Sequence, residues 1–285
     1  MPTGESYEEI IEAQRGWFAF NWREFFRYRD LLLVFAWRDV LLKFRELSLG
    51  PVWFLVQPLS TAFIFSVIFG RLAQISTDKI PAVLFYLSGL LLWTYFSHCL
   101  SEVSGIFSGR GDLYKKIYFP RLIVPLSIIL SNLITFLIQA ALFSLIYFYF
   151  KIWNPSAKDL SPSLFCVWLP FLILQTSALS LGCGFWLSAL TSKNKDMQGV
   201  IGFLLQLWMY ATPVIYPTSM VPEKWRALQA LNPMSSIIEG SRYAFFGIGT
   251  IHLKHFMISA LITLVILVTG VMVFNKFERE FLDES

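Results

Sequence analysis

The chain has 285 residues, of which 56% are hydrophobic and only 15% are charged, and it contains 28 Phe, 11 Tyr and 10 Trp. A soluble domain of this size cannot bury so much apolar surface, so the composition excludes that class and predicts an all-α integral membrane protein. The net charge of +4 comes from Lys and Arg near the membrane ends, which excludes a nucleic-acid-binding face.

The first predicted element is an amphipathic region that precedes the membrane spans. Ser6 to Glu9 forms a capping box that opens a helix, and Asp30 to Leu49 interleaves apolar with basic residues before Gly50-Pro51 ends the pattern. Helices of this kind lie in the membrane surface. We therefore expect residues 1–50 to form a cytoplasmic, amphipathic interfacial region, with a simple membrane anchor as the alternative. The acidic start of the chain does not have the pattern of a cleaved signal peptide.

Membrane-spanning helices are predicted from stretches that are almost free of charged residues. A span must cross roughly 30 Å of hydrocarbon, which takes about 20 helical residues. Six stretches are long enough, and together they define a transmembrane domain over residues 51–275, followed by a cytoplasmic tail at 276–285. The expected spans are about 51–70, 80–104, 122–150, 164–190, 197–216 and 256–275.

The distribution of Lys and Arg predicts the orientation of these spans. The two termini and alternate connections carry fifteen of these residues, whereas the other connections carry eight. Because basic residues concentrate on the cytoplasmic side of a membrane, both termini and the 108–121 connection are expected in the cytoplasm.

The spans carry almost no group that is suited to catalysis. Within the spans, His98 and Glu102 are the only histidine or charged residues. The three cysteines, Cys99, Cys166 and Cys183, lie in apolar segments without the spacing of metal ligands. We therefore predict that this chain is not an enzyme and that it holds no metal ion.

Modest polarity does occur in stripes along two spans. Ser127, Ser131, Thr135 and Gln139 repeat every four residues beside Asn132. In the first span, Gln57, Ser60 and Thr61 share a face with Trp53. Two interpretations remain open: hydrogen bonds between helices, or the wall of a polar conduit.

The coupling region is expected at residues 112–121, which read DLYKKIYFPR. Asp112 can cap a short helix, and Leu113 and Tyr114 offer apolar anchors. Lys115 and Lys116 face water or an acidic partner, and Pro120 breaks the helix before the next span. A short helix held between two spans is suited to docking, because it pushes on both spans when a partner moves; the alternative is that its basic residues only fix topology.

The connection from residue 217 to 255 has the pattern of two short helices rather than a loop. Pro222 opens the first of them. Asn232-Pro233 is an N-cap followed by proline at the first helical position, and it opens a second helix that runs to Gly247. Together with the Thr212-Pro213 break, this pattern suggests structure that dips back into the outer leaflet, and a lid over an exit is a plausible use.

Three regions of the sequence carry a resemblance to a known family. They are Arg45–Trp53 with Pro58, Asp112–Pro125, and Thr212–Pro217 followed by Val221-Pro222-Glu223, Asn232-Pro233 and Arg242. These regions and the six spans resemble permease subunits of the ABC-2 class, in particular the exporters of lipid-linked O antigen, capsule or teichoic acid. The departures are Leu47, where relatives often have Ser or Thr, and Asp112, where Asn is frequent.

The resemblance implies the partners and the site residues. The 112–121 segment would contact a separate ATP-hydrolysing subunit, through Asp112, Leu113, Tyr114, Lys115, Lys116 and Arg121. This chain has no Gly-x-x-x-x-Gly-Lys-Ser/Thr loop, so ATP and Mg²⁺ would be bound by that partner, and this chain would hold no cofactor. A homodimer with two ATPase subunits in a bacterial cytoplasmic membrane is implied, with an external re-entrant gate. The gate residues would be Pro213, Tyr216, Pro217, Asn232, Pro233 and Arg242.

The substrate contacts follow from the chemistry of a lipid-linked polysaccharide. Sugar rings stack on aromatic side chains, and the phosphate of a lipid carrier attracts basic residues. Arg38, Lys43 and Arg45 are the candidates for the cytoplasmic entrance, with Arg45 preferred. The conduit candidates are Trp53, Tyr86, Trp93, Tyr95, Trp208 and Tyr210; the alternative for these is an interfacial aromatic belt.

Other functions remain as alternatives. Within the class, the chain would export a small drug or lipid. From another class, an integral-membrane transferase acting on polyprenyl-linked sugars would need paired carboxylates or a metal cluster, and a channel would need no docking surface.

Overall fold

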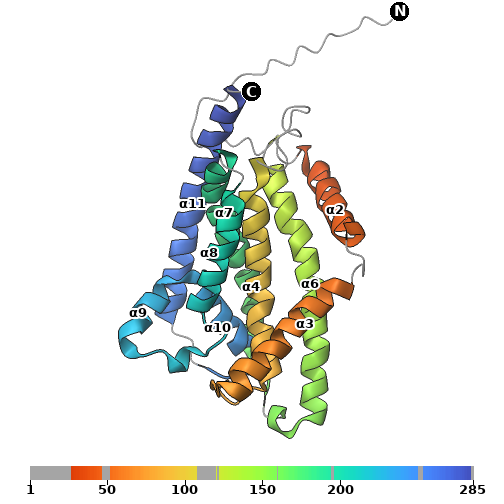
Figure 1. Ribbon diagram of the computed structural model, residues 1–285, viewed down its shortest axis with the longest axis vertical. Coiled ribbons are helices and arrows are strands. Elements are labelled where there is room, and N and C mark those ends of the chain that lie inside the picture. Colours follow the sequence, from red (N-terminus) through yellow and green to blue (C-terminus); the bar gives the residue numbers. More distant parts are fainter. Residues whose placement is uncertain are drawn as a thin grey trace, which may run out of the picture.

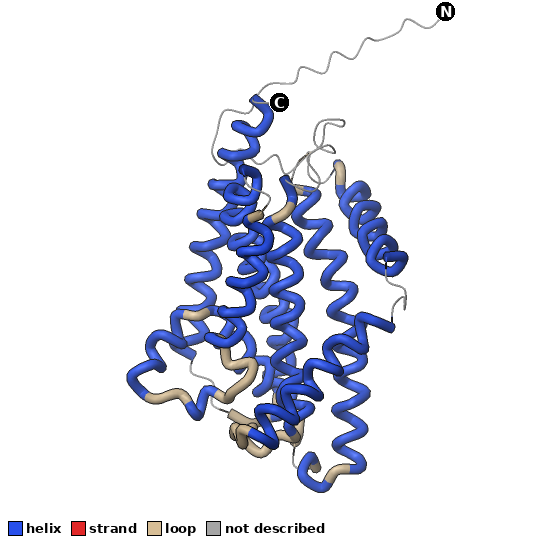
Figure 2. Tube along the Cα trace, viewed as in Figure 1, coloured by secondary structure: helices blue, strands red, loops and turns tan. Residues whose placement is uncertain are grey.

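The structure is a computed structural model that describes residues 27–46, 52–107, 120, 122–158, 160–193, 196–249 and 253–283. In these ranges it consists of helices and loops, without a strand (Figures 1 and 2). The long helices are α2 (Arg29–Glu46), α3 (Trp53–Phe65) continued by the π-helix η2 (Ser66–Leu72), α4 (Ala82–Ser104), α6 (Ile123–Trp153), α7 (Leu169–Lys193) preceded by the 3-10 helix η4 (Leu164–Trp168), α8 (Met197–Ala211) and α11 (Leu253–Asp283). The shorter ones are η3 (Pro155–Ala157), η5 (Thr218–Met220), α9 (Glu223–Leu231) and α10 (Pro233–Phe246).

Five of the six predicted spans are confirmed as helices that are long and apolar enough to cross a membrane. They are Trp53–Leu72, Ala82–Ser104, Ile123–Trp153, Leu164–Ser192 and Leu253–Phe277. The chain is therefore a multi-pass membrane protein. The sixth predicted span, at 197–216, is not confirmed, because α8 ends at Ala211 after 15 residues. At about 1.5 Å per residue this helix covers about 22 Å, and Pro213 prevents its continuation.

Helix α4 occupies the centre of the bundle, with α3, α6, α7, α8 and α10 packed around it. Of the most apolar 18 residues of α4, 78% are buried within the chain. The corresponding fractions are 11% for the span Trp53–Leu72 and 22% for the span of α11. Large side chains such as Phe85, Tyr86 and Phe96 are fully enclosed. The helices at the edge of the bundle leave their apolar faces for lipid or for another protein.

Helices α7 and α11 approach each other most closely, at two glycines. A Cβ atom added to Gly182 would lie 2.8 Å from the backbone of Ile266 and Leu267, and Gly270 of α11 faces the backbone of Gly182. Across the same interface Gln175 Nε2 donates to Ser259 Oγ at 2.7 Å. Small residues such as Gly182 allow helix backbones to approach this closely.

The two short helices predicted after residue 217 are confirmed. The Asn232 side chain accepts a hydrogen bond from Met234 N at 3.2 Å, and Pro233 occupies the first turn of α10. The helix ends at Gly247, which has the left-handed conformation, with φ of 66°. Helix α10 packs against α4, α7 and α11 at the lower end of the molecule in Figure 1. Its insertion into the outer leaflet stays a prediction.

The predicted N-terminal amphipathic region lies partly outside the described residues, which include only 27–46 of it. Helix α2 lies beside α6, and the two pack together (Figure 1). Phe35, Ala36 and Val40 are buried, whereas Leu33 and Trp37 are 58% and 59% exposed. This exposed apolar stripe is suited to contact with lipid, and the interfacial position stays a prediction.

Candidate functional site

The predicted coupling residues Asp112 to Lys116 and Arg121 lie outside the described residues. Residues on either side of the 108–121 connection are described, and both sides are anchored in one apolar cluster. Phe107 before the segment and Ile123 after it are both buried in this cluster. The cluster also joins α2, α7 and α11, through Phe35, Phe185 and Phe274 respectively. A displacement of the 108–121 connection would therefore be transmitted to the five helices that share this cluster, at the upper end of the bundle in Figure 1. These helices are α2, α4, α6, α7 and α11.

The three predicted entrance residues have different environments. Lys43 lies between α4 and α6: its Nζ is 2.8 Å from Glu102 Oε1 and donates to Asn132 Oδ1 at 2.8 Å. Arg38 Nη2 bonds Asp39 Oδ1 at 3.1 Å, and this carboxylate is buried. Arg45 is exposed and has no ion pair within the described part of the chain. Of the three, Arg45 therefore keeps a charge that is available to a ligand.

The Lys43–Glu102 ion pair is expected to stabilise the contact of α2 with the bundle. In a double-mutant cycle with Lys43→Met and Glu102→Gln, we expect a coupling energy of about 1–2 kcal/mol, because both side chains are mostly buried and Lys43 makes a second hydrogen bond. The measurement is denaturant unfolding of the purified protein. The control cycle uses Arg29→Met and Asp30→Asn, whose side chains are 75% and 86% exposed, and should give a coupling near zero. Equal coupling in the two cycles would contradict this role.

The predicted conduit residues do not form one surface. Tyr86, Trp93 and Tyr95 are buried within the chain, with exposed fractions of 0%, 5% and 3%. Tyr95 OH and Ser177 Oγ are 2.7 Å apart and share a hydrogen bond. Trp93 and Trp208 belong to one aromatic cluster, with ring centroids 6.4 Å apart.

Trp53 and Tyr210 are the two conduit candidates that are exposed, at 41% and 48%. Trp53 opens α3 and Tyr210 lies near the end of α8. These two residues can meet a substrate without a change in the packing of the chain.

The polar stripe in α6 makes hydrogen bonds of two kinds. Ser127 and Ser131 donate to backbone oxygens one turn earlier in the same helix. Asn132 accepts from Lys43 of α2, and Gln139 Nε2 donates to Phe54 O of α3 at 3.2 Å. The observed contacts favour the interpretation as hydrogen bonds between helices over a conduit wall in α6.

The predicted gate residues are brought together at the lower end of the bundle. Asn232 is the centre: its Oδ1 accepts from Trp208 Nε1 at 3.1 Å, and its Nδ2 donates to Thr212 Oγ1 at 2.9 Å. The N-cap of α10 is thereby bonded to the end of α8 and to the non-helical residues 212–217, which we call the break. Pro217 is buried and Tyr216 packs against the main core. Burial raises the pKa of Tyr216.

Arg242 of α10 connects the break to α4. Its guanidinium donates to Pro213 O at 2.5 Å and to Val214 O at 2.8 Å, and it lies over the Phe85 ring at 3.7 Å. Burial lowers its pKa to about 9, which leaves the group charged at neutral pH. A Cβ atom on Gly89 would lie 2.7 Å from Arg242 Nη2, so α4 needs glycine there.

Sequence reasoning missed three of these features. Glu102 was identified only as an isolated charged residue within a span. Its ion pair was missed because Lys43 is far away in the chain. The role of Gly89 depends on Arg242, again from a distant segment. The burial of Tyr86, Trp93 and Tyr95 has no signal in the sequence, because buried and conduit aromatics have the same residue types.

Comparison with known proteins gives a match over most of the chain. The profile of the family described as ABC-2 type transporter matches residues 30–246. The chain is 28% identical over 261 residues to the O-antigen export system permease protein RfbA of Myxococcus xanthus, which covers 91% of this chain and 96% of that protein. It is 26% identical to the protein of the same name from Klebsiella pneumoniae, over 88% and 93%. It is 24% identical to the polysialic acid transport protein KpsM of Escherichia coli, over 73% and 78%.

Proposed function

Because the chain belongs to the ABC-2 type transporter family, we propose that it is the transmembrane permease subunit of an ATP-driven exporter of lipid-linked polysaccharide, either O antigen or a related polymer. The observation that carries the proposal is the similarity over nearly the whole chain to proteins named for O-antigen export, together with the polysialic acid transport protein. Permeases of such exporters work with ATP-binding subunits.

The energy for export comes from two separate ATP-binding subunits, which bind the ATP and Mg²⁺. Their contact on this chain is the 112–121 segment, with Tyr114, Lys115 and Lys116 at its centre. The support from the fold is the apolar cluster in which Phe107 and Ile123 flank the segment. Such a cluster is tightly packed, so it transmits a displacement to the attached helices.

A homodimer is the proposed assembly, with the conduit between the copies. Helix α3 exposes Gln57 and Ser60, and α8 exposes Gln206, although both helices are mostly apolar. Polar side chains in a membrane avoid hydrocarbon and face protein or water. Trp53 lies one turn before Gln57, and Tyr210 lies one turn after Gln206. These two faces are therefore the part of the chain that we assign to the conduit.

The location that accords with this role is a bacterial cytoplasmic membrane, with both termini in the cytoplasm. The end of the bundle that holds Phe107, Ile123 and Phe274 then faces the ATPase. The end that holds Asn232 and Arg242 faces outward, where it acts as a gate. Arg45 is the proposed contact for the phosphate of the lipid carrier at the entrance.

Purification of the chain from its host in mild detergent tests the proposal. We expect a stoichiometric ATP-binding subunit to co-purify and to give vanadate-sensitive ATPase activity. A deletion strain should lose polymer from its surface, whereas an exporter of a drug or lipid would leave the polymer intact. Isolation of the chain alone and without activity, under conditions in which a known transporter stays assembled, would contradict the ATP-driven mechanism. The transferase and channel alternatives would then require direct assays.

A further inference from the structure

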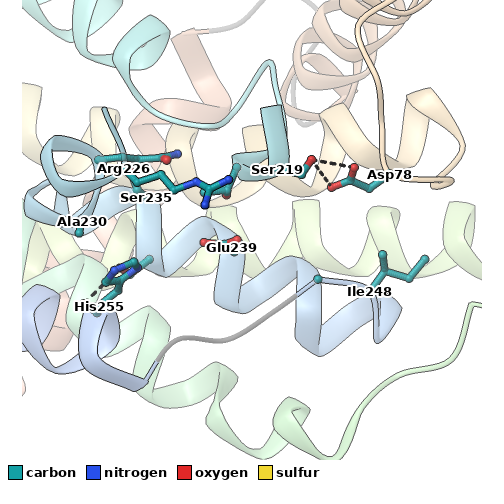
Figure 3. Close-up of a pocket in the computed structure, with 12 residues that line it drawn as sticks. Asp78, Ser219, Arg226, Ala230, Ser235, Glu239, Ile248 and His255 are labelled. Atoms are coloured by element: carbon teal, nitrogen blue, oxygen red, sulfur yellow. Dashed lines mark hydrogen bonds between the residues drawn. The ribbon is translucent and has the colours of Figure 1, made fainter. Parts of the chain in front are cut away.

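A cavity of about 430 Å³, with several polar residues in its lining, lies at the end of the bundle that carries α9 and α10 (Figure 3). Its volume falls in the range of about 300–1,000 Å³ that is typical of small-molecule sites. Segments far apart in the sequence build it: the loop before α4, the loop before α9, and the helices α9, α10 and α11. The polar residues that carry the argument are Asp78, Ser219, Arg226, Gln229, Ser235 and Glu239.

Two of the lining residues have buried polar atoms without a hydrogen-bond partner. Both the Nε2 and the Oε1 atoms of Gln229 lack one in the described part of the chain, and so does Ser235 Oγ. Buried amides and hydroxyls are almost always paired in folded proteins. The flexible Gln229 side chain can turn its amide toward a ligand in the cavity, where it would both donate and accept. These unpaired groups therefore point to a ligand that forms hydrogen bonds.

The part of the lining formed by Asp78 and Ser219 is held in place before any ligand binds. Ser219 Oγ donates to the Asp78 carboxylate, at 2.9 Å from Oδ1 and 3.2 Å from Oδ2. Asp78 and Lys79 both have positive φ, of 49° and 67°. Thr77 Oγ1, which donates to Ile80 O at 2.6 Å, supports this unusual backbone. Residues held in this conformation cluster at binding sites, because the surrounding structure must enforce them.

The charges around the cavity are of both signs, with Asp78 and Glu239 beside Arg226, and this mixture favours a neutral ligand with many hydroxyl groups. Asp78 and Glu239 would repel a phosphate or a carboxylate. A metal ion is disfavoured, because the described residues contain no group of three or more His, Cys, Asp or Glu arranged to hold one. Carboxylates accept hydrogen bonds from hydroxyls, and Arg226 and Gln229 donate to ring and hydroxyl oxygens. This combination is complementary to a sugar.

We propose that this cavity binds one or two sugar units on the side of the membrane opposite the ATPase. The assignment of the sugar to the exported polymer rests on the proposed function, whereas sugar binding itself does not. A weak site at this position would hold the emerging polymer between transport steps and oppose its backward movement. Gln229 and Asp78, which both line the cavity, contact the sugar directly.

The test measures sugar binding to the full chain in lipid nanodiscs by saturation-transfer NMR. The probes are D-galactose, D-mannose, L-rhamnose and N-acetyl-D-glucosamine, with inorganic phosphate and Ca²⁺ as competitors. We expect saturable binding of at least one sugar, weakened about 10-fold or more by the double change Gln229→Leu and Ser235→Ala, since both hydrogen-bonding groups are lost. Asp78→Asn, in a surface loop, is a second variant with the same expected direction. The control is Ser144→Ala, the same exchange as at Ser235 but at an exposed position of α6 outside the cavity.

The outcomes separate this proposal from the proposed function. If no probe sugar binds to the folded protein, if both pocket variants bind as the wild type does, or if phosphate or Ca²⁺ occupies the cavity instead, the sugar site is wrong. That result would leave the proposed function in polysaccharide export unchanged. If the sugar binds and the pocket variants weaken it, the site stands even when the co-purification experiment finds no ATPase.

Discussion

Replacement of Arg242 by alanine is expected to lower the stability of the protein by about 3–5 kcal/mol and to abolish export. The guanidinium is buried and bonds the carbonyl oxygens of Pro213 and Val214. Without it, two buried carbonyls lose their donor and a cavity remains beside Phe85. The break would separate from α4, and the end of the bundle at α10 would lose its link to the centre. The measurement is the thermal unfolding of the purified protein, together with the polymer on the cell surface.

Three further variants make this prediction specific. Arg242→Lys keeps the charge but has no fork to bridge the carbonyls, so an intermediate loss is expected. Gly89→Ala should displace the same guanidinium from the other side, because the added Cβ would lie 2.7 Å from Nη2 and 3.3 Å from Val214 O. The control is Arg71→Ala, at an exposed position of η2, with an expected change within about 0.5 kcal/mol. An unchanged unfolding midpoint for Arg242→Ala would show that Arg242 does not hold the break.

Simultaneous replacement of Tyr114, Lys115 and Lys116 by alanine is expected to uncouple ATP hydrolysis from export. The docking anchors would be lost while the apolar cluster around Phe107 and Ile123 stays intact, so the chain should still insert and fold. Allosteric couplings of about 1–3 kcal/mol correspond to roughly 5- to 150-fold effects, and we expect export to fall by a factor in this range. The measurements are surface polymer in cells and ATPase activity in proteoliposomes.

The matched control changes the same residue types at the other end of α6 and beyond it, as Tyr149→Ala, Lys151→Ala and Lys158→Ala. This variant should export at the level of the wild type, since these residues are remote from the proposed ATPase contact. Equal amounts of both variants in the membrane fraction are required for the comparison. Normal export in the Tyr114, Lys115 and Lys116 variant would show that the 112–121 segment does not couple the subunits.

The sequence predicted the features that depend on local chemistry. Apolar stretches predicted five of the helices, and Asn232-Pro233 with Gly247 predicted both ends of α10. The Thr212-Pro213 break was also predicted, but not its consequence for α8, because an apolar run continues to Val214-Ile215 and hides the end of the helix. A local sequence pattern indicates which helix or turn a segment can form. It does not indicate the residue at which the packing of neighbouring segments ends that helix.

The candidate site was less predictable because it depends on contacts between distant segments. The resemblance grouped Asn232 and Arg242 with the break, and the structure brings them together there. The pairing of Lys43 with Glu102 had no signal, since either charge alone looks like a topology marker. The cavity was missed for the same reason: Asp78 and Gln229 are far apart in the sequence, and only the fold places both in the lining of one cavity.

The contact of Gly182 with the backbone of α11 has a mechanical consequence. Helices that slide or repack during a transport cycle need interlocking side chains that have two stable arrangements. At Gly182 and Gly270 there is no such layer, because backbone meets backbone. Helices α7 and α11 therefore move as one pair, so a displacement transmitted through Phe185 and Phe274 shifts them together. The change in packing that opens the path has to occur elsewhere, at the less buried helices α3 and α8.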